Sequence, residues 1–232
     1  MTGITLAQIG WDILDFYRAN VKNDDSVDIR QIYFWIQNMR AKLLKQKFDK
    51  PLAIINEAYA QALPTLALQT IDSTQVPSVP SNRYIVQTVL DLPQTLERAN
   101  YTHTFTRISA PNLISEGYPI IRYEDISTYG NGVFNTRAVV AFILGQKICL
   151  MSKDKFAVRG LGNIYARGVF QNPLAAGQMS VPTFNEFSDY PITQQLIEEL
   201  KQILLQNPTF QLTEKPPEDV EPVTQDELTK KV

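Results

Sequence analysis

The chain has 232 residues, of which 44% are hydrophobic and 20% are charged, and its formal net charge at pH 7 is −2. This composition is typical of a globular protein that can bury a core, either as one large domain or as two small ones. A net charge so near zero gives the whole molecule no general attraction to nucleic acid or to anionic membranes.

Residues 1–64 are predicted to form a helical region. Apolar residues recur at helical spacing from Thr5 to Arg18, and a polar connection follows. A helix of about six turns is predicted from Asp28 to Phe48, since this stretch lacks Gly and Pro and begins with a good N-cap residue. Two helices joined by so short a loop are expected to pack antiparallel. A further helix is predicted from Leu52 to Leu63.

The long helix should have one main buried stripe, formed by Ile29, Ile32, Tyr33, Ile36, Met39, Leu43 and Leu44. Phe34 and Trp35 lie away from this stripe, so the β-region or a second subunit is expected to cover them. The cations of this helix do not share a single stripe, which favours a solvated face over a nucleic-acid track. They are Arg30, Arg40, Lys42, Lys45 and Lys47.

Residues 65–187 are predicted to be rich in β-strands separated by Pro, Gly, Ser and Asn. The predicted strands are Thr65–Ile71, Tyr84–Leu90, Tyr101–Ile108, Pro119–Tyr123, Val139–Leu144 and Lys147–Met151, with one or two more within Phe156–Phe170. Gly145 and Gln146 are expected to form a type II′ hairpin turn. Short strands at this spacing favour an antiparallel sandwich or small barrel.

Residues 188–212 are predicted to pack on the rest through a helix from Thr193 to Gln206. Residues 213–232 form an acidic, proline-rich tail that cannot build a core of its own. The expected fold is therefore α+β, with an N-terminal helical hairpin containing a long helix, a central antiparallel β-sandwich or small barrel, a C-terminal helix and an extended tail.

The sequence predicts neither a signal peptide nor a membrane span. Gln8, Asp12 and Asp15 interrupt the first helical segment. The longest apolar run, Ala138–Leu144, is far shorter than the ~20 residues that a spanning helix needs. A soluble protein of the cytoplasm, with no membrane partner, is expected.

Candidate catalytic residues are few. The single histidine, His103, lies in an alternating strand-like segment, and no Ser or Cys motif suggests a partner for it. The single cysteine, Cys149, lies in the apolar run 147–151 and is predicted to be a buried core residue. We therefore expect no enzyme activity, no catalytic residue and no bound cofactor.

Three motifs resemble ligand sites but lack essential members. Gly160-Leu-Gly162 has no third glycine and no following amphipathic helix, so a turn or bulge is expected there. Tyr129-Gly-Asn-Gly132 lacks the Lys-Ser/Thr of a phosphate loop. The acidic stretch Asn23–Asp28 lacks the glycine and distal glutamate of an EF-hand, so helix capping is the better explanation. No metal site is predicted.

Three longer stretches resemble a family of virion structural proteins from crAss-like tailed phages. They are Asp28-Ile-Arg-Gln-Ile-Tyr-Phe-Trp-Ile-Gln-Asn-Met-Arg-Ala; the strand region with Ile121-Arg-Tyr-Glu, a glycine-rich turn and Ile148-Cys-Leu; and Ile164-Tyr-Ala-Arg-Gly-Val-Phe-Gln-Asn-Pro173 followed by Asp189-Tyr-Pro-Ile192. The resemblance covers about Asp28 to Asp226. The segment Leu52–Leu68 departs from the family pattern.

The resemblance implies a non-enzymatic ring of the phage neck, with twelve copies, that joins the portal and capsid to the tail. The implied partners are other copies of the chain, the portal protein, adjacent neck or tail rings, and double-stranded DNA that passes without specific binding. Such a protein is assembled in the host cytoplasm and resides in the virion. The tail from Thr213 is expected to contact an adjacent subunit or ring.

Two alternatives remain open at this point. One is another accessory protein of the same virion, such as a tail hub or stopper. The other is a glycan-binding β-module or a degraded hydrolase. A glycan site would use exposed loop aromatics such as Tyr118, Tyr123 and Tyr129, although each is more often a packing residue.

Overall fold

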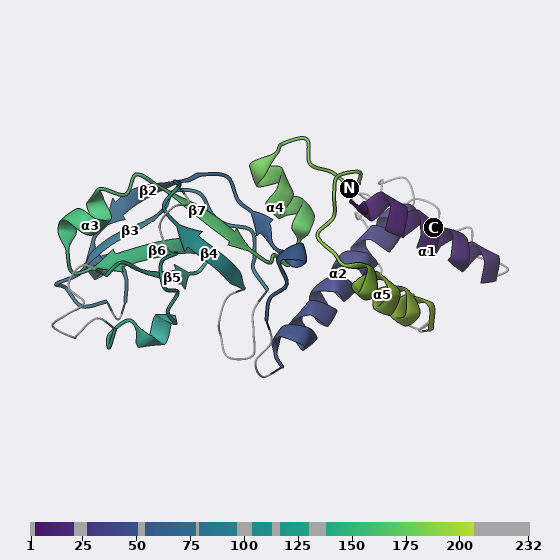
Figure 1. Ribbon diagram of the computed structural model, residues 1–232, viewed down its shortest axis with the longest axis horizontal. Helices are drawn as coiled ribbons and strands as arrows, with labels where there is room; N and C mark the ends of the chain where they lie inside the picture. The colour runs from purple at the N-terminus through teal and green to yellow at the C-terminus, as the bar shows by residue number, and fades with distance from the viewer. Residues whose placement is uncertain are drawn as a thin grey trace, which may run out of the picture.

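The computed structural model describes residues 3–20, 27–50, 54–77, 79–96, 104–112, 117–129 and 138–206. In this part of the chain the molecule is elongated, with a curled β-sheet at one end and helices α1, α2 and α5 at the other (Figure 1). The α+β fold is therefore confirmed. His103, the tail 213–232 and most of the acidic stretch Asn23–Asp28 lie outside the described residues.

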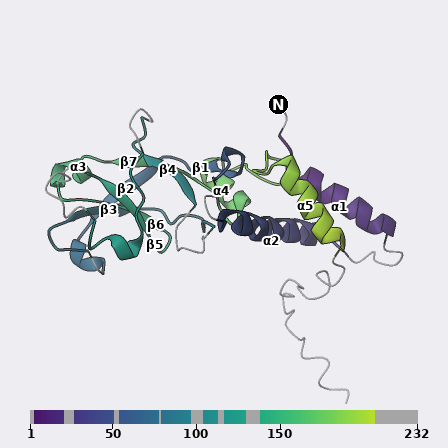
Figure 2. The ribbon, with the colours of Figure 1, turned by 60° about the horizontal axis from the view of Figure 1, so that its bottom comes forward.

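The helical end contains α1 (Leu6–Asn20), α2 (Ile29–Phe48) and α5 (Gln194–Gln206). The chain runs away from the sheet along α1 and returns toward it along α2, as Figures 1 and 2 show. Thr5 and Gln8 form a reciprocal capping box at the start of α1, with both N···O distances 3.1 Å. Asp28 caps α2 through the Arg30 amide. The predicted starts of these two helices are thus confirmed by their caps.

The β-region is one curled sheet of seven strands among the described residues, and every strand pair is antiparallel. The strands are β1 (Gln61–Ala62), β2 (Leu66–Ile71), β3 (Tyr84–Thr88), β4 (Phe105–Ser109), β5 (Val140–Leu144), β6 (Lys147–Ser152) and β7 (Asn163–Gly168). Their order is β1-β7-β2-β3-β6-β5, and β4 pairs with the other edge of β7. The small-barrel alternative is therefore closer to the structure than the sandwich.

Residues 117–121 connect the two free edges of this sheet. The Tyr118 amide donates to the Ile108 carbonyl of β4, and the Ile121 amide donates to the Ala141 carbonyl of β5. The Ala141 amide in turn donates to the Pro119 carbonyl. These bonds satisfy backbone groups that an open sheet edge would expose.

Strands β3, β5 and β6 are buried on both faces. One core, which includes Val86 and Leu150, lies on the concave side, and a second, which includes Phe142 and Cys149, lies on the opposite face. Burial on both faces explains why β5 and β6 appear in the sequence as continuous apolar runs rather than alternating ones.

The predicted hairpin of β5 and β6 is confirmed. Leu144 pairs with Lys147, so Gly145 and Gln146 form a two-residue turn. Gly145 has φ +60°, a conformation that primed turns require at this position.

Three sequence predictions were wrong. In the described part of Leu52–Leu63 there is a 3-10 turn, Glu57–Tyr59, followed by β1, because pairing with β7 outweighs the helix propensity of the alanines. Pro119–Tyr123 is not a strand, since it makes one bridge at Ile120 and then enters a 3-10 turn.

The third error concerns the first half of Phe156–Phe170, where Asp154 caps a short helix, α3 (Lys155–Arg159), through the Phe156 amide. A further helix, α4 (Pro173–Ser180), was not predicted, although Asn172 caps it and Pro173 occupies its first turn.

Candidate functional site

The helical and β parts of the molecule meet around Arg40, in the middle of α2. Its side chain is fully buried. Nε and Nη2 donate to the Pro191 carbonyl at 3.1 and 2.9 Å, and Nη1 donates to the Phe170 carbonyl at 3.1 Å. Nη2 also reaches the Tyr59 carbonyl at 3.5 Å. One guanidinium therefore joins α2 to three segments that are distant in the sequence.

The charge of Arg40 is stabilised by carbonyl dipoles and an aromatic ring, and its partners among the described residues include no carboxylate. The guanidinium carbon lies 5.6 Å from the centre of the Tyr190 ring, which adds a cation–π contact to the carbonyl bonds. Burial lowers the pKa of Arg40, but an arginine still keeps its proton at any physiological pH. The bonds of this buried cation therefore fix how the helical part and the β part of the molecule meet at this joint.

The prediction of a solvated face was wrong for Arg40. Arg40 is four residues from both Ile36 and Leu44, so it belongs to the buried side of the helix. The signal in the sequence is this helical spacing, which separates Arg40 from the exposed cations that share its charge.

Two tyrosines complete the joint. Burial raises the pKa of Tyr190 to about 12, although the neighbouring Arg40 charge acts in the opposite direction. The Tyr190 hydroxyl is buried and has no hydrogen-bond partner among the described residues. The Tyr59 hydroxyl, in contrast, pairs with Thr193 Oγ1 at 2.9 Å, just before α5 begins.

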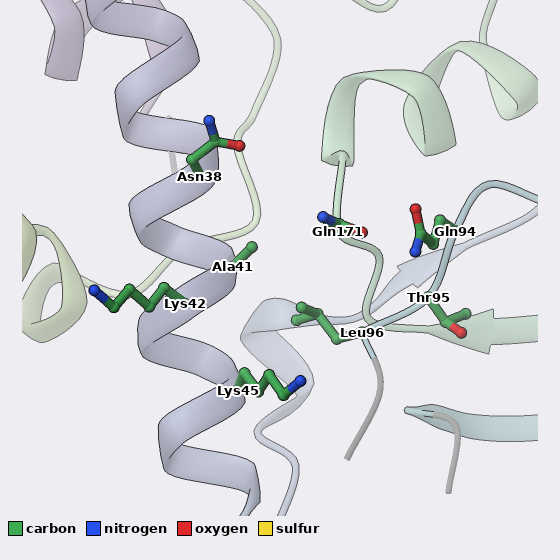
Figure 3. Close-up of a pocket in the computed structure, with 8 residues that line it drawn as sticks. All are labelled: Asn38, Ala41, Lys42, Lys45, Gln94, Thr95, Leu96 and Gln171. Carbon is green, nitrogen blue, oxygen red and sulfur yellow. The ribbon is translucent and has the colours of Figure 1, made fainter. Parts of the chain in front are cut away.

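A groove of about 380 Å³ lies beside this joint, between α2 and the edge of the β-region (Figure 3). Its floor consists of the buried residues Ala41, Thr95 and Leu96. Its rim consists of exposed amides and ammonium groups, from Asn38, Lys42, Lys45, Gln94 and Gln171. Among the described residues, the lining thus includes two lysines and no carboxylate.

The floor of the groove is held by backbone pairing. Thr95 forms a bridge with Phe170, and the Leu96 amide donates to the Val169 carbonyl. The Thr104 hydroxyl lies 2.7 Å from the Val169 carbonyl and 3.0 Å from the Leu96 carbonyl. The floor of the groove is therefore held in place by contacts within the protein.

The remaining cations of α2 do not form a continuous surface. Lys47 pairs with Glu199 of α5 at 2.9 Å, and Arg30 lies exposed near the start of the helix. Lys42 and Lys45 both line the groove, but only Lys45 extends toward it, whereas the Lys42 side chain points away (Figure 3). Of the five cations that the sequence singled out, Lys45 alone therefore directs its ammonium group toward the groove (Figure 3).

Large apolar side chains are exposed at both ends of the molecule. Trp11, Phe16 and Phe34 are about half exposed on the helical end. At the far end of the sheet, Phe156 of α3 is 84% exposed, and Arg159 lies over the ring of the partly exposed Tyr84. Single exposed aromatic side chains are common on protein surfaces. A group of them at each end of the subunit is, however, suited to contacts between subunits.

Trp35 and Phe34 have different environments. Trp35 is 5% exposed and is buried in the helical core of its own chain, so no second subunit is needed to cover it. Phe34 is 46% exposed.

The other candidate residues have structural roles where they are described. Cys149 is fully buried, as predicted, and burial raises the pKa of its thiol to about 12. Gly160 ends α3, and Gly162 precedes β7, so this motif forms a turn. No cluster of three or more metal-ligating side chains occurs within the described ranges.

The three loop tyrosines are half-buried. Tyr118 packs against the inner core of the sheet, and burial raises its pKa. Tyr123 packs against Phe142 and donates to the Pro77 carbonyl. Tyr129 packs against the second core, and its carbonyl accepts a bond from Arg83. These packing roles weaken the glycan-binding alternative.

A family model described as phage tail ring protein 2, from crAss-like phages, matches residues 8–228. The chain belongs to this family. Ring proteins of this family are structural components of the virion, so the resemblance found in the sequence is confirmed at that level. A search of curated proteins gave no match. No helix in the described part of this ring protein is long and apolar enough to cross a membrane.

Proposed function

We propose that this ring protein forms a closed, non-enzymatic ring of twelve copies in the neck of the phage, where it joins the portal to the tail and lines part of the DNA passage. The observation that carries the proposal is the family match, which spans almost the whole chain. The copy number and the position between portal and tail follow the family resemblance described above.

The shape of the subunit supports a ring. A closed ring with cyclic symmetry uses heterologous contacts, in which one surface of each copy meets a different surface of the next. The exposed aromatics on α1 and α2 and those around α3 lie at opposite ends of the subunit (Figure 1). Two separate surfaces are therefore available for contacts with neighbours.

Native mass spectrometry of the purified full chain, alone and mixed with its portal protein, tests the proposal. We expect a closed oligomer of twelve copies, either alone or on the portal, and a ring in negative-stain images of the same samples. A monomer that ignores the portal at every concentration would contradict the proposal, and binding to host polysaccharide would then favour the glycan-binding alternative.

A further inference from the structure

We propose that Arg40 sets the angle between the helical part and the β part of the subunit, and that this angle decides how many copies close the ring. This inference rests on the proposed ring, because copy number has a meaning only in a closed assembly. It goes beyond that proposal by assigning the control of copy number to one side chain inside the subunit.

The surfaces available for neighbouring copies belong to different parts of the subunit. Trp11 and Phe34 are about half exposed on the helical part, and Phe156 is 84% exposed on α3. Figures 1 and 2 place α1 at one end of the molecule and α3 at the other, with the joint around Arg40 between them. In a ring that uses one surface from each part, a rotation at the joint changes the direction in which the next copy is added.

A small rotation is enough to change the size of a ring. Successive copies are turned by about 30° in a ring of twelve, by about 33° in a ring of eleven and by about 28° in a ring of thirteen. A change of about 3° in each subunit therefore adds or removes one copy. A subunit that closes rings of one size must hold its two parts at a fixed angle.

Apolar packing at the joint defines this angle poorly. The helical core includes three buried residues from the segments between α2 and α5, namely Tyr59, Leu96 and Val169. All three lie outside the strands, so no strand directs this packing across the joint. The hydrophobic effect is non-directional, and it tolerates a small rotation of one part against the other. The orientation must then depend on hydrogen bonds, which are directional.

The guanidinium of Arg40 provides directional bonds to both parts. Nε and Nη2 donate to the Pro191 carbonyl, just before α5, and this pair of bonds holds the guanidinium plane against the helical part. Nη1 then donates to the Phe170 carbonyl in one fixed direction, because the donors of arginine form a rigid planar fork.

The Phe170 carbonyl is itself fixed to the sheet. Phe170 is fully buried in the inner core of the β part, forms a bridge with Thr95 and packs edge-on against Phe105, with 6.0 Å between the ring centres. The bond from Arg40 to Phe170 therefore transmits the orientation of α2 and α5 to the whole sheet.

Arg40→Lys tests this inference in the full chain. Lysine keeps the positive charge, but its single ammonium group lacks the planar fork and cannot hold the Pro191 and Phe170 carbonyls in one fixed arrangement. Native mass spectrometry, alone and on the portal, should show one copy number for the unchanged chain. In Arg40→Lys we expect at least two neighbouring copy numbers, with the original ring size about twofold less abundant.

Leu150→Ala is the matched control for a general loss of stability. Leu150 is fully buried in the inner core of the sheet, away from the joint, so its truncation leaves a cavity without altering the Arg40 bonds. This variant should keep the copy number of the unchanged chain. If its rings varied in size as widely as those of Arg40→Lys, instability rather than the joint angle would explain the result, and the inference would be overturned.

A distance measurement tests the joint without relying on copy number. Spin labels are placed at Thr65→Cys, just before β2, and at Gln202→Cys on α5, both of which are exposed. The native Cys149 is fully buried and takes up no label. Double electron–electron resonance on labelled chain diluted with excess unlabelled chain should give one narrow distance, and Arg40→Lys should broaden it about twofold. An unchanged distribution would show that Arg40 does not set the angle.

The outcomes separate this inference from the proposed ring. Rings of one size in both the unchanged chain and a folded Arg40→Lys variant would overturn the inference and leave the ring intact. A broadened distance with an unchanged copy number would show that contacts between copies decide the ring size, which also overturns it. A chain that stays monomeric even with the portal would overturn the proposed ring and, with it, the control of copy number.

Discussion

At the scale of single residues, the structure depends most on Arg40. A buried guanidinium costs much desolvation energy, which here is offset by bonds to three backbone carbonyls and by the Tyr190 ring. Carbonyl groups from Phe170 and Pro191 would lose their partner if this side chain were removed, and a large cavity would be left between the two parts of the molecule.

We therefore expect Arg40→Ala to lower the free energy of unfolding by about 3–5 kcal/mol, as measured by urea denaturation followed by circular dichroism. Gln46→Ala, an exposed change on the same helix, is the control and should change stability by less than about 0.5 kcal/mol. Equal stability of the two variants would show that the Arg40 bonds contribute nothing to the joint.

Tyr190 gives a pH-dependent prediction. Its pKa is raised to about 12 in the folded state, against about 10 in the unfolded chain, so the native state binds more protons than the unfolded state between these values. The stability that this proton contributes is present below pH 10 and is lost as the pH rises toward 12. Tyr190→Phe should therefore lose less stability than the unchanged chain as the pH rises above 10. At pH 7 its stability should be nearly the same, because the buried hydroxyl has no partner among the described residues.

The matched control for this variant is Tyr59→Phe, which removes the bond to Thr193 and should cost about 1 kcal/mol at pH 7. Urea unfolding at several pH values between 7 and 11 measures both effects. If the stability of Tyr190→Phe fell as steeply with rising pH as that of the unchanged chain, Tyr190 would not be the group responsible for the loss.

At the scale of elements, the sequence predicted best where local signals and burial agree. Helices α1, α2 and α5 have caps and apolar stripes, and the β5–β6 hairpin has Gly145 at its turn. Prediction failed where distant partners decide the structure. Gln61 and Ala62 pair with β7, and residues 117–121 join two sheet edges that are far apart in the chain.

The groove could not be predicted for the same reason. Its two sides come from α2 and from the paired segments around Thr95 and Gln171, which no local pattern brings together. The sequence shows that Lys42 and Lys45 are cations. Their environments differ from those of Arg40 and Lys47 because of which sides of α2 pack against α5 and the sheet, and the sequence does not show this.

The hairpin turn provides a prediction at this scale. Gly145→Ala places a Cβ in open space, so its cost comes only from the positive φ of the turn. We expect a loss of about 1 kcal/mol, and a smaller loss for Gly145→Asn, because asparagine tolerates the left-handed region better. Thermal unfolding of both variants measures the difference. A loss for asparagine equal to that for alanine would point to a cause other than backbone conformation.

At the scale of the whole molecule, the elongated subunit separates its two sets of exposed aromatics. If the ring uses the end near α3, Phe156 is the strongest candidate for an anchor, because its ring is 84% exposed and contributes little to the core. Aromatic side chains often supply a large share of the binding energy at interfaces.

Phe156→Ser should therefore leave thermal stability nearly unchanged and raise the dissociation constant of ring assembly by about tenfold or more. Sedimentation velocity over a range of concentrations measures the assembly. Lys155→Ser, at the adjacent exposed position, is the control and should assemble like the unchanged chain. Assembly of Phe156→Ser at the level of this control would exclude the α3 end as a ring contact.

The proposed passage of DNA through the ring would limit the affinity of the ring for phosphate. A lumen that bound the duplex tightly would slow its transit, and the net charge of −2 provides little attraction. We expect fluorescence anisotropy with a labelled duplex to give a dissociation constant weaker than about 1 µM at physiological salt, rising steeply with salt concentration. Nanomolar affinity for the duplex at physiological salt would contradict this prediction.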